Sequence, residues 1–170
     1  MTGSIKSSLI RFFEKSTMNH KTRLQKGEQA PDFELPDQDG RLFRLSSQTG
    51  SRTVLYFYPK DNTIGCTLQA CTLRDHYAIL LEKGFHVVGI SSDGAESHRK
   101  FIARYRLPFS LLSDTDGKVS SLYDVYAEKN IFGRRFKGIA RTTFVISASG
   151  IIEKVIDDVD TAGHASQVIE

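Results

Sequence analysis

Short apolar runs and longer amphipathic segments alternate along much of this chain. Residues 53–58 and 85–91 are dominated by β-branched and aromatic residues, a pattern typical of strands buried on both faces of a sheet. Each run is followed by apolar residues at helical spacing, over residues 68–81 and around residues 101–105. Gly84 stands where the first of these helices is expected to end. Because strand and helix alternate twice, we expect the two strands to pair in parallel.

Turn signals predict a hairpin at the beginning of the folded part. The short runs 33–35 and 42–45 flank an Asp-Gly pair at residues 39–40, a favourable sequence for a tight turn between antiparallel strands. Further along the chain, residues 109–112 have the pattern of a short strand and residues 119–126 that of a short helix.

A second hairpin and a final helix are expected near the C-terminus. Residues 142–147 and 151–156 are strand-like and flank the turn sequence Ala-Ser-Gly at residues 148–150. Residues 162–170 have a helical pattern, whereas the course of residues 130–138 is not defined. The order of elements predicts an α/β domain with a central mixed β-sheet flanked by helices and an N-terminal β-hairpin extension.

Composition and charge narrow the class of protein. The chain has 170 residues, 39% of them apolar, which suits one soluble globular domain with a full core. Residues 1–26 hold six Lys or Arg against Glu14 alone, a local charge of +5, so the overall +3 leaves −2 for residues 27–170. We expect a basic extension over residues 1–26, either a short amphipathic helix or a frayed tail, and one domain over residues 27–170. The small net charge and the absence of an apolar run of ~20 residues predict neither a nucleic-acid nor a membrane partner.

Cys66 is the first candidate for chemistry. It lies where the loop after a central strand becomes the first turn of a helix, and ligands of open α/β sheets bind at that edge. Unpaired backbone N–H groups and the helix dipole favour the thiolate there, which is the reactive form of cysteine. The alternative is that Cys66 is a small buried hydrophobic residue, the commonest fate of a free cysteine.

Cys71 follows five residues later and offers a second thiol that can resolve an oxidised Cys66 as a disulfide. Five residues along a regular helix place the two Cα atoms roughly 8 to 9 Å apart. A disulfide tolerates at most about 7 Å, so the first helical turns must unwind if the pair bonds. Two unrelated cysteines are the alternative. The spacing of Cys66, Cys71 and His76 argues against zinc, because these side chains spiral around a helix.

The segment around these cysteines resembles a known active site. Tyr58-Pro-Lys-Asp-Asn-Thr-Ile-Gly-Cys-Thr-Leu-Gln-Ala-Cys71 is similar to that of the peroxiredoxins of the bacterioferritin comigratory protein (PrxQ) type. The Pro-x-x-x-Thr-x-x-Cys pattern falls on Pro59, Thr63 and Cys66, and the similarity extends over roughly residues 27–170. The resemblance implies a thioredoxin-like fold. It also implies that hydrogen peroxide and organic hydroperoxides are reduced at the expense of thioredoxin or a similar dithiol.

The resemblance also assigns the reacting groups. Cys66 matches the peroxidatic cysteine, which becomes a sulfenic acid, and Cys71 matches the resolving cysteine of atypical two-cysteine members. Arg141 matches the family arginine, whose permanent charge would stabilise the thiolate and the leaving group. A surface arginine is the alternative interpretation.

Three residues of the motif are expected to surround the peroxide. The Thr63 hydroxyl would lie near the thiolate, or serve only as a helix cap. Pro59 would shield the thiolate from water and also ends the strand. Gly65 would allow its own N–H and that of Cys66 to approach the peroxide. Family members commonly carry proline where this chain has Ile64, and the added freedom of the unwound loop should favour the oxidised state by about 0.4 to 1 kcal/mol.

Two other functions remain open from the sequence. A general thiol-disulfide oxidoreductase would be expected to use Cys-x-x-Cys, which the spacing here does not match. A non-enzymatic holdase or redox-sensing partner protein belongs to another class, and the amphipathic N-terminus is its best clue. No histidine is spaced to act as a base for either cysteine. We expect no cofactor, no metal, a monomer and a cytoplasmic location.

Overall fold

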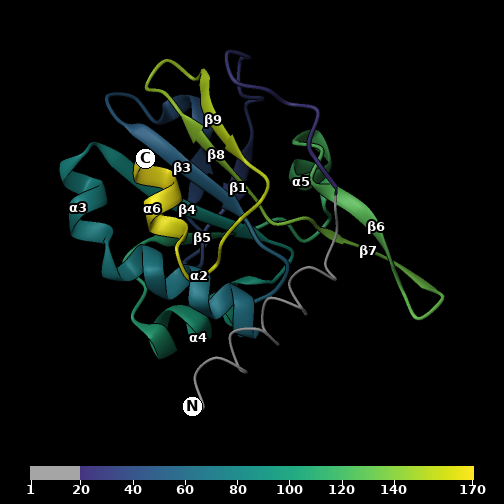
Figure 1. The fold of residues 1–170 in the computed structure, drawn as a ribbon. Helices are drawn as coiled ribbons and strands as arrows, with labels where there is room; N and C mark the ends of the chain where they lie inside the picture. The colour runs from purple at the N-terminus through teal and green to yellow at the C-terminus, as the bar shows by residue number, and fades with distance from the viewer. Residues whose placement is uncertain (1–19) are drawn as a thin grey trace, which may run out of the picture.

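The computed structural model describes residues 20–170, so the helix or tail expected within residues 1–19 lies outside the described residues. A central sheet of five strands has the order β5-β4-β3-β8-β9 (Figure 1). The strand bounds are β3 Arg52–Phe57, β4 Phe85–Ser91, β5 Ser110–Ser113, β8 Thr142–Ile146 and β9 Ile152–Ile156. The strands β3, β4 and β5 are parallel, and β8 is antiparallel to both β3 and β9. The expected mixed sheet is therefore confirmed.

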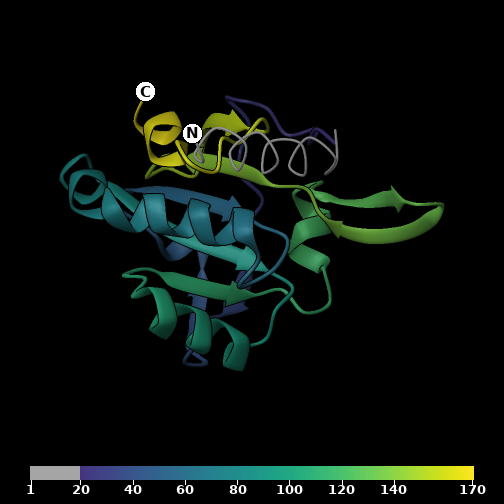
Figure 2. The ribbon, with the colours of Figure 1, turned by 60° about the horizontal axis from the view of Figure 1, so that its bottom comes forward.

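Helices cover the sheet unequally. Among the described residues, α2, α3, α4 and α6 lie on one face, and α5 lies on the other with the N-terminal hairpin (Figure 2). The bounds are α2 Ile64–Asp75, α3 Tyr77–Glu82, α4 Ala95–Tyr105, α5 Lys118–Leu122 and α6 His164–Ile169, with a 3-10 turn over Leu45–Ser47. The sheet is buried on both faces, as the apolar runs predicted.

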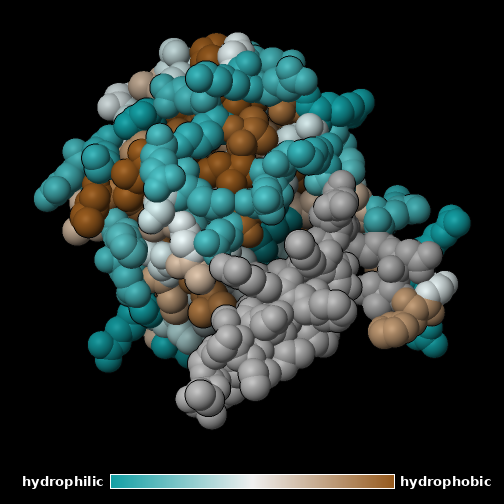
Figure 3. Space-filling view, in the orientation of Figure 1, coloured by the Kyte–Doolittle hydropathy of each residue, from teal (hydrophilic) through white to brown (hydrophobic). Residues whose placement is uncertain are grey.

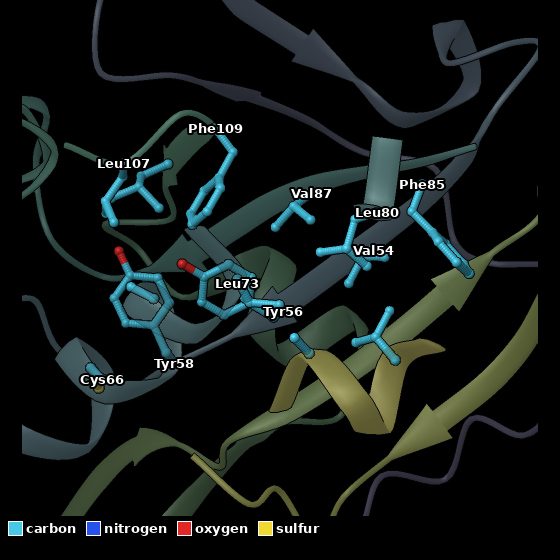
Figure 4. Close-up of a cluster of buried hydrophobic side chains, with 14 of the residues drawn as sticks. Val54, Tyr56, Tyr58, Cys66, Leu73, Leu80, Phe85, Val87, Leu107 and Phe109 are labelled. Carbon is cyan, nitrogen blue, oxygen red and sulfur yellow. The ribbon is translucent and has the colours of Figure 1, made fainter. Parts of the chain in front are cut away.

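The central strand β3 divides the core into two clusters. Val54 and Tyr56, with Tyr58 just beyond the strand, point to the side of α2 (Figure 4), whereas Leu55 and Phe57 point to the opposite side. All five side chains are buried. Strand alternation with both faces covered thus explains the continuous apolar run in the sequence.

Both expected hairpins are present. The strands β1 Glu34–Pro36 and β2 Leu42–Arg44 pair antiparallel around a turn in which Gly40 has a φ of 79°. The hairpin of β8 and β9 turns at Gly150, with a φ of 86°. Glycine suits both turns because a side chain is strained at such a φ.

A third hairpin was not anticipated. The strands β6 Tyr126–Ile131 and β7 Arg134–Ile139 pair with each other and project away from the domain (Figures 1 and 2). The helix expected over residues 119–126 ends at Leu122, and Tyr126 already belongs to β6. Phe132 and Gly133 form the turn with positive φ at both positions. Phenylalanine is not a usual turn residue at such a φ, so the sequence carried no clear turn signal.

The helix expected over residues 68–81 is divided in two. His76 separates α2 from α3 with φ −105° and ψ 11°, and its ring Nδ1 lies 2.9 Å from the carbonyl oxygen of Thr72. Leu73 and Leu80 still enter the same core cluster on either side of the break. The expected end at Gly84 is confirmed by its φ of 81°.

The surface agrees with a globular domain. Among the coloured residues of Figure 3, hydrophilic side chains predominate, and apolar residues form patches between them. Within residues 20–170, no helix is long and apolar enough to cross a bilayer.

The described end of the N-terminal extension is bonded to the domain. Thr22 Oγ1 donates to the carbonyl oxygen of Tyr123 at 2.7 Å, and the Arg23 amide donates to Asp124 at 2.8 Å. The last residues of the expected extension therefore contact the segment after α5, and its boundary with the domain stays a prediction.

Candidate active site

The loop after β3 delivers Cys66 to the start of α2. Pro59 is half-buried directly after the buried Tyr58. Thr63 occupies the N-cap position with φ −77° and ψ 156°, and the helix begins at Ile64. Cys66 is therefore the third residue of α2, where backbone N–H groups lack partners within the helix. Together with the helix dipole, they favour negative charge at this position.

Tertiary structure places a cation beside the Cys66 sulfur. Arg141 comes immediately before β8, and its Nη1 donates to Cys66 Sγ at 3.4 Å. The same Nη1 donates to Gln69 Oε1 at 2.7 Å. Cys66 is 1% exposed and lies in the apolar cluster on the α2 side of the sheet (Figure 4). The thiol is buried, yet it is in contact with the charge that the sequence analysis assigned to it.

The other expected residues lie around the loop. Thr63 is exposed, and its hydroxyl donates to the carbonyl oxygen of Lys60 at 2.9 Å; its side chain makes no capping hydrogen bond. Gly65 is half-buried next to Cys66. Cys71 is a free, half-buried thiol further along α2. The structure thus brings Cys66 and Arg141 together, whereas the Thr63 hydroxyl bonds within the loop.

Gln69 is a polar residue of the site that the sequence analysis missed. It is fully buried, three residues after Cys66 and on the same side of α2. Its Oε1 holds Arg141, while its Nε2 is buried without a hydrogen-bond partner. A glutamine at helical spacing from a reactive cysteine was the available signal. We assign Gln69 the role of orienting the guanidinium toward Cys66.

Burial controls the ionisation of two side chains near the site. Burial, followed by the charge of the nearby Cys66, raises the pKa of Tyr56 well above its usual value, so its phenol stays protonated. Burial lowers the pKa of His164 to about 4. The two ring nitrogens of His164 are paired with Thr143 Oγ1 at 2.8 Å and Gln167 Oε1 at 2.9 Å. His164 is therefore neutral at pH 7, and both of its nitrogens are occupied away from the sulfur.

These features define a thiol enzyme on an α/β fold. A cysteine at a helix N-terminus and beside a guanidinium is in the environment that activates thiols as nucleophiles. The chain belongs to the AhpC/TSA family, whose model matches residues 26–155. It is a peroxiredoxin, which is a thiol-dependent peroxidase, and the resemblance seen around Cys66 is confirmed.

Curated relatives agree with this assignment. The chain is 44% identical over 146 residues to the peroxiredoxin Bcp of Escherichia coli, covering 86% of this chain and 94% of the relative. It is 39% identical over 144 residues to the peroxiredoxin Bcp of Bacillus subtilis, covering 85% of this chain and 92% of the relative. The similarity therefore spans nearly the whole length of both relatives.

Solved structures confirm the thioredoxin-like fold of this group. Peroxidoxin BcpB of Mycobacterium tuberculosis is 35% identical with a TM-score of 0.77, covering 86% of this chain and 95% of that one. A PrxQ variant of Xylella fastidiosa is 29% identical with a TM-score of 0.82, covering 88% and 95%. The bacterioferritin comigratory protein of Xanthomonas campestris is 32% identical with a TM-score of 0.80, covering 86% and 94%.

Proposed function

We propose that Cys66 reduces hydrogen peroxide and organic hydroperoxides, that Cys71 resolves the product as an intramolecular disulfide, and that thioredoxin or a similar dithiol reduces this disulfide. The observation that carries the proposal is the 3.4 Å contact between Arg141 Nη1 and Cys66 Sγ at the first turn of α2. A thiolate paired with a fixed cation at a helix N-terminus is suited to nucleophilic attack. The dithiol requirement favours a reducing compartment, and we propose the cytoplasm.

The proposed reaction has three steps. The Cys66 thiolate attacks one peroxide oxygen, the O–O bond breaks, and the other oxygen takes a proton and leaves as water or an alcohol. The Cys71 thiolate then attacks the sulfur of the Cys66 sulfenic acid. A disulfide forms, and the hydroxyl group takes a proton and leaves as water. An external dithiol finally reduces the disulfide by thiol-disulfide exchange and is itself oxidised.

The surroundings of Cys66 suggest how each neighbour contributes to the first step. Arg141 would stabilise the thiolate and then the negative charge on the leaving oxygen. The backbone N–H groups of Gly65 and Cys66 would bind the peroxide, and Pro59 would limit access of water. The Thr63 hydroxyl donates to the Lys60 carbonyl oxygen at 2.9 Å, so it would meet the peroxide as a hydrogen-bond acceptor.

Exposed apolar side chains favour alkyl hydroperoxides among the substrates. Ile64 is 70% exposed and Leu68 is 36% exposed, one helical turn apart on α2 and on either side of Cys66 in the sequence. An alkyl chain can cover such side chains and remove their surface from water. The structure of the Xanthomonas campestris relative was solved to study its alkyl peroxide reduction activity. This activity of a relative supports alkyl hydroperoxides as substrates here.

The resolving step requires a conformational change. Cys66 and Cys71 both belong to the continuous helix α2. Their five-residue separation in a helix corresponds to roughly 8 to 9 Å between Cα atoms, beyond the disulfide limit of about 7 Å. We therefore propose that the first turns of α2 unwind locally after Cys66 is oxidised and re-form on reduction.

Mass spectrometry of the peroxide-treated protein tests the proposal. We expect one equivalent of hydroperoxide to lower the mass of the intact chain by two hydrogen atoms, and digestion to give a peptide pair joined through Cys66 and Cys71. Sulfinic acid at Cys66 with a free Cys71 thiol would contradict the resolving role. Unmodified cysteines after treatment would contradict the peroxidase itself.

Replacing Ile64 by proline is expected to make the disulfide easier to reduce. Ile64 is the first residue of α2, where proline is favoured, and Thr63 already has the extended conformation that a following proline requires. Proline reduces the conformational freedom of the unwound loop and should destabilise the disulfide form by about 0.4 to 1 kcal/mol. The reduction potential of the disulfide should therefore rise by about 10 to 20 mV. Equilibration with glutathione or dithiothreitol measures this change. Ile64→Ala is the control, and equal potentials for the wild type and Ile64→Pro would rule the idea out.

A further inference from the structure

A second polar centre forms around Asp61. This residue belongs to the active-site loop, which we define as residues 60–65. The side chain of Asp61 is 1% exposed, and three groups surround its carboxylate. Tyr58 Oη donates to Oδ1 at 2.6 Å, and Ser97 Oγ donates to Oδ2 at 2.8 Å. His98 Nδ1 lies 2.8 Å from the same Oδ2. We call these four residues the Asp61 cluster, and both oxygens of its carboxylate are occupied.

His98 holds the carboxylate in a defined orientation. His98 is fully buried, and its Nε2 lies 3.0 Å from the carbonyl oxygen of Leu112, which can only accept a hydrogen bond. His98 Nε2 therefore donates to this carbonyl oxygen, which fixes the ring with Nδ1 facing Asp61 Oδ2. Burial raises the pKa of Tyr58 well above its usual value, so its hydroxyl remains a donor to Asp61.

The surroundings favour a hydrogen-bond network over a cation site. Within residues 20–170, Asp61, Asp93 and His98 each offer one ligand atom, all within 4.8 Å of one another. However, Asp93 Oδ2 already accepts from the Asp61 backbone amide at 2.8 Å and from Ser91 Oγ at 2.7 Å. These donors, and those on both oxygens of Asp61, compete with a cation for the carboxylate oxygens.

The Asp61 cluster ties the loop to rigid elements of the fold. Asp61 belongs to the loop after β3, Ser97 and His98 belong to α4, and the carbonyl oxygen that fixes His98 belongs to β5. The next loop residue, Asn62, has a φ of 62°, a conformation that needs support from its surroundings. Cys66 follows Asp61 by only five residues and α2 begins at Ile64, so we expect a displacement of Asp61 to reach the start of α2.

We propose that Asp61 is a positioning residue, whose bonds to Tyr58, Ser97 and His98 hold the loop and the first turn of α2 in the arrangement where Cys66 meets Arg141. Breaking the Asp61 cluster allows this turn to open. The inference has a second part, which rests on the proposed Cys66–Cys71 disulfide: the cluster must open when α2 unwinds, so it stabilises the reduced form relative to the disulfide form.

Tyr58→Phe and Tyr123→Phe form a matched pair for the first part. Both tyrosines are buried, and both variants remove a hydroxyl. Tyr58 Oη contacts Asp61 Oδ1 at 2.6 Å and His98 Nδ1 at 3.4 Å, both within the cluster. Tyr123 Oη instead donates to the carbonyl oxygen of Pro31 at 2.7 Å, away from the loop. In the reduced protein, we expect Tyr58→Phe to speed hydrogen exchange about tenfold at the amides of Asp61 and Thr67. These amides donate to Asp93 Oδ2 and to the Thr63 carbonyl oxygen. Equal exchange rates in the two variants would overturn the positioning role.

The reduction potential tests the second part. We expect Tyr58→Phe to lower the potential of the disulfide by about 30 mV, which is a tenfold change for two electrons, and Tyr123→Phe to leave it unchanged. Faster exchange with an unchanged potential would overturn the coupling to the disulfide. Ser97→Ala removes another bond to Asp61 at a half-buried position, and it serves as the second variant if Tyr58→Phe does not fold. If the wild type forms no disulfide, the proposed role of Cys71 fails, while hydrogen exchange still decides the positioning role.

Discussion

Replacement of Cys66 by serine is expected to abolish hydroperoxide reduction, because a serine hydroxyl without an adjacent base is a poor nucleophile. Replacement of Cys71 by serine should leave the first oxidation step intact and stop turnover with a dithiol reductant. Repeated exposure of the Cys71→Ser variant to peroxide should then convert Cys66 to sulfinic acid, since no neighbouring thiol captures the sulfenic acid. Both effects follow from assigning one thiol to attack and the other to resolution.

Stopped-flow mixing with hydroperoxide measures the first step, and a thioredoxin-coupled assay measures turnover. A general thiol-disulfide oxidoreductase would exchange disulfides without rapid oxidation by peroxide. A non-enzymatic holdase or redox-sensing protein would show no sustained consumption of peroxide. If both single variants consumed peroxide and thioredoxin as the wild type does, the assignment of both cysteines would be wrong.

Replacement of Arg141 by methionine should slow the reaction of Cys66 with hydroperoxide by about 10²- to 10³-fold. Arg141 Nη1 donates to Cys66 Sγ at 3.4 Å in a buried site, where the loss of a fixed cation is poorly compensated by water. The same change would remove the donor that we propose for the leaving oxygen, so we expect both the attacking thiolate and the transition state to be destabilised. Lysine is not an equivalent replacement, because its ammonium group lies on a flexible stem and lacks the planar shape of the guanidinium.

The measurement is the second-order rate constant for oxidation of Cys66 at fixed pH. Arg135→Met is the matched control, since Arg135 is an exposed residue of β7. We expect this control to react as the wild type does. A rate constant for Arg141→Met within threefold of the wild type would show that the contact does not activate the sulfur.

Much of the fold follows from local patterns. The strand expected over residues 53–58 agrees with β3 to within one residue at each end, and β4 has the expected bounds. Both hairpins with a glycine turn formed as expected, because their turn residues and strand patterns agree. The pattern failed at the hairpin of β6 and β7, where the first four residues of β7 are exposed and the turn contains Phe132. An exposed stretch has no buried face, so no alternation of apolar residues marks it as a strand.

Some residues of the site could likewise be predicted from the sequence, and others could not. Cys66 could be located from the sequence because strand, loop and helix follow one another directly, and the resemblance supplied Arg141. The partner contacts of Gln69 were not foreseeable. Nor was the Asp61 cluster, in which Asp61 and His98 are 37 residues apart along the chain. The sequence analysis gave His98 no catalytic role, and in the structure it is a partner of Asp61.

Local sequence was thus sufficient for the strands of the central sheet and for the helix terminus at Cys66, because periodicity, turn residues and helix ends act over a few residues. It did not predict the hairpin of β6 and β7 or the break between α2 and α3. The contacts of the Cys66 sulfur depend on the three-dimensional fold. Parallel pairing of β3 with β4 and antiparallel pairing with β8 bring Arg141 to Cys66, and α4 brings His98 to the loop. Such contacts join residues distant in the chain, and only packing of the whole domain determines them.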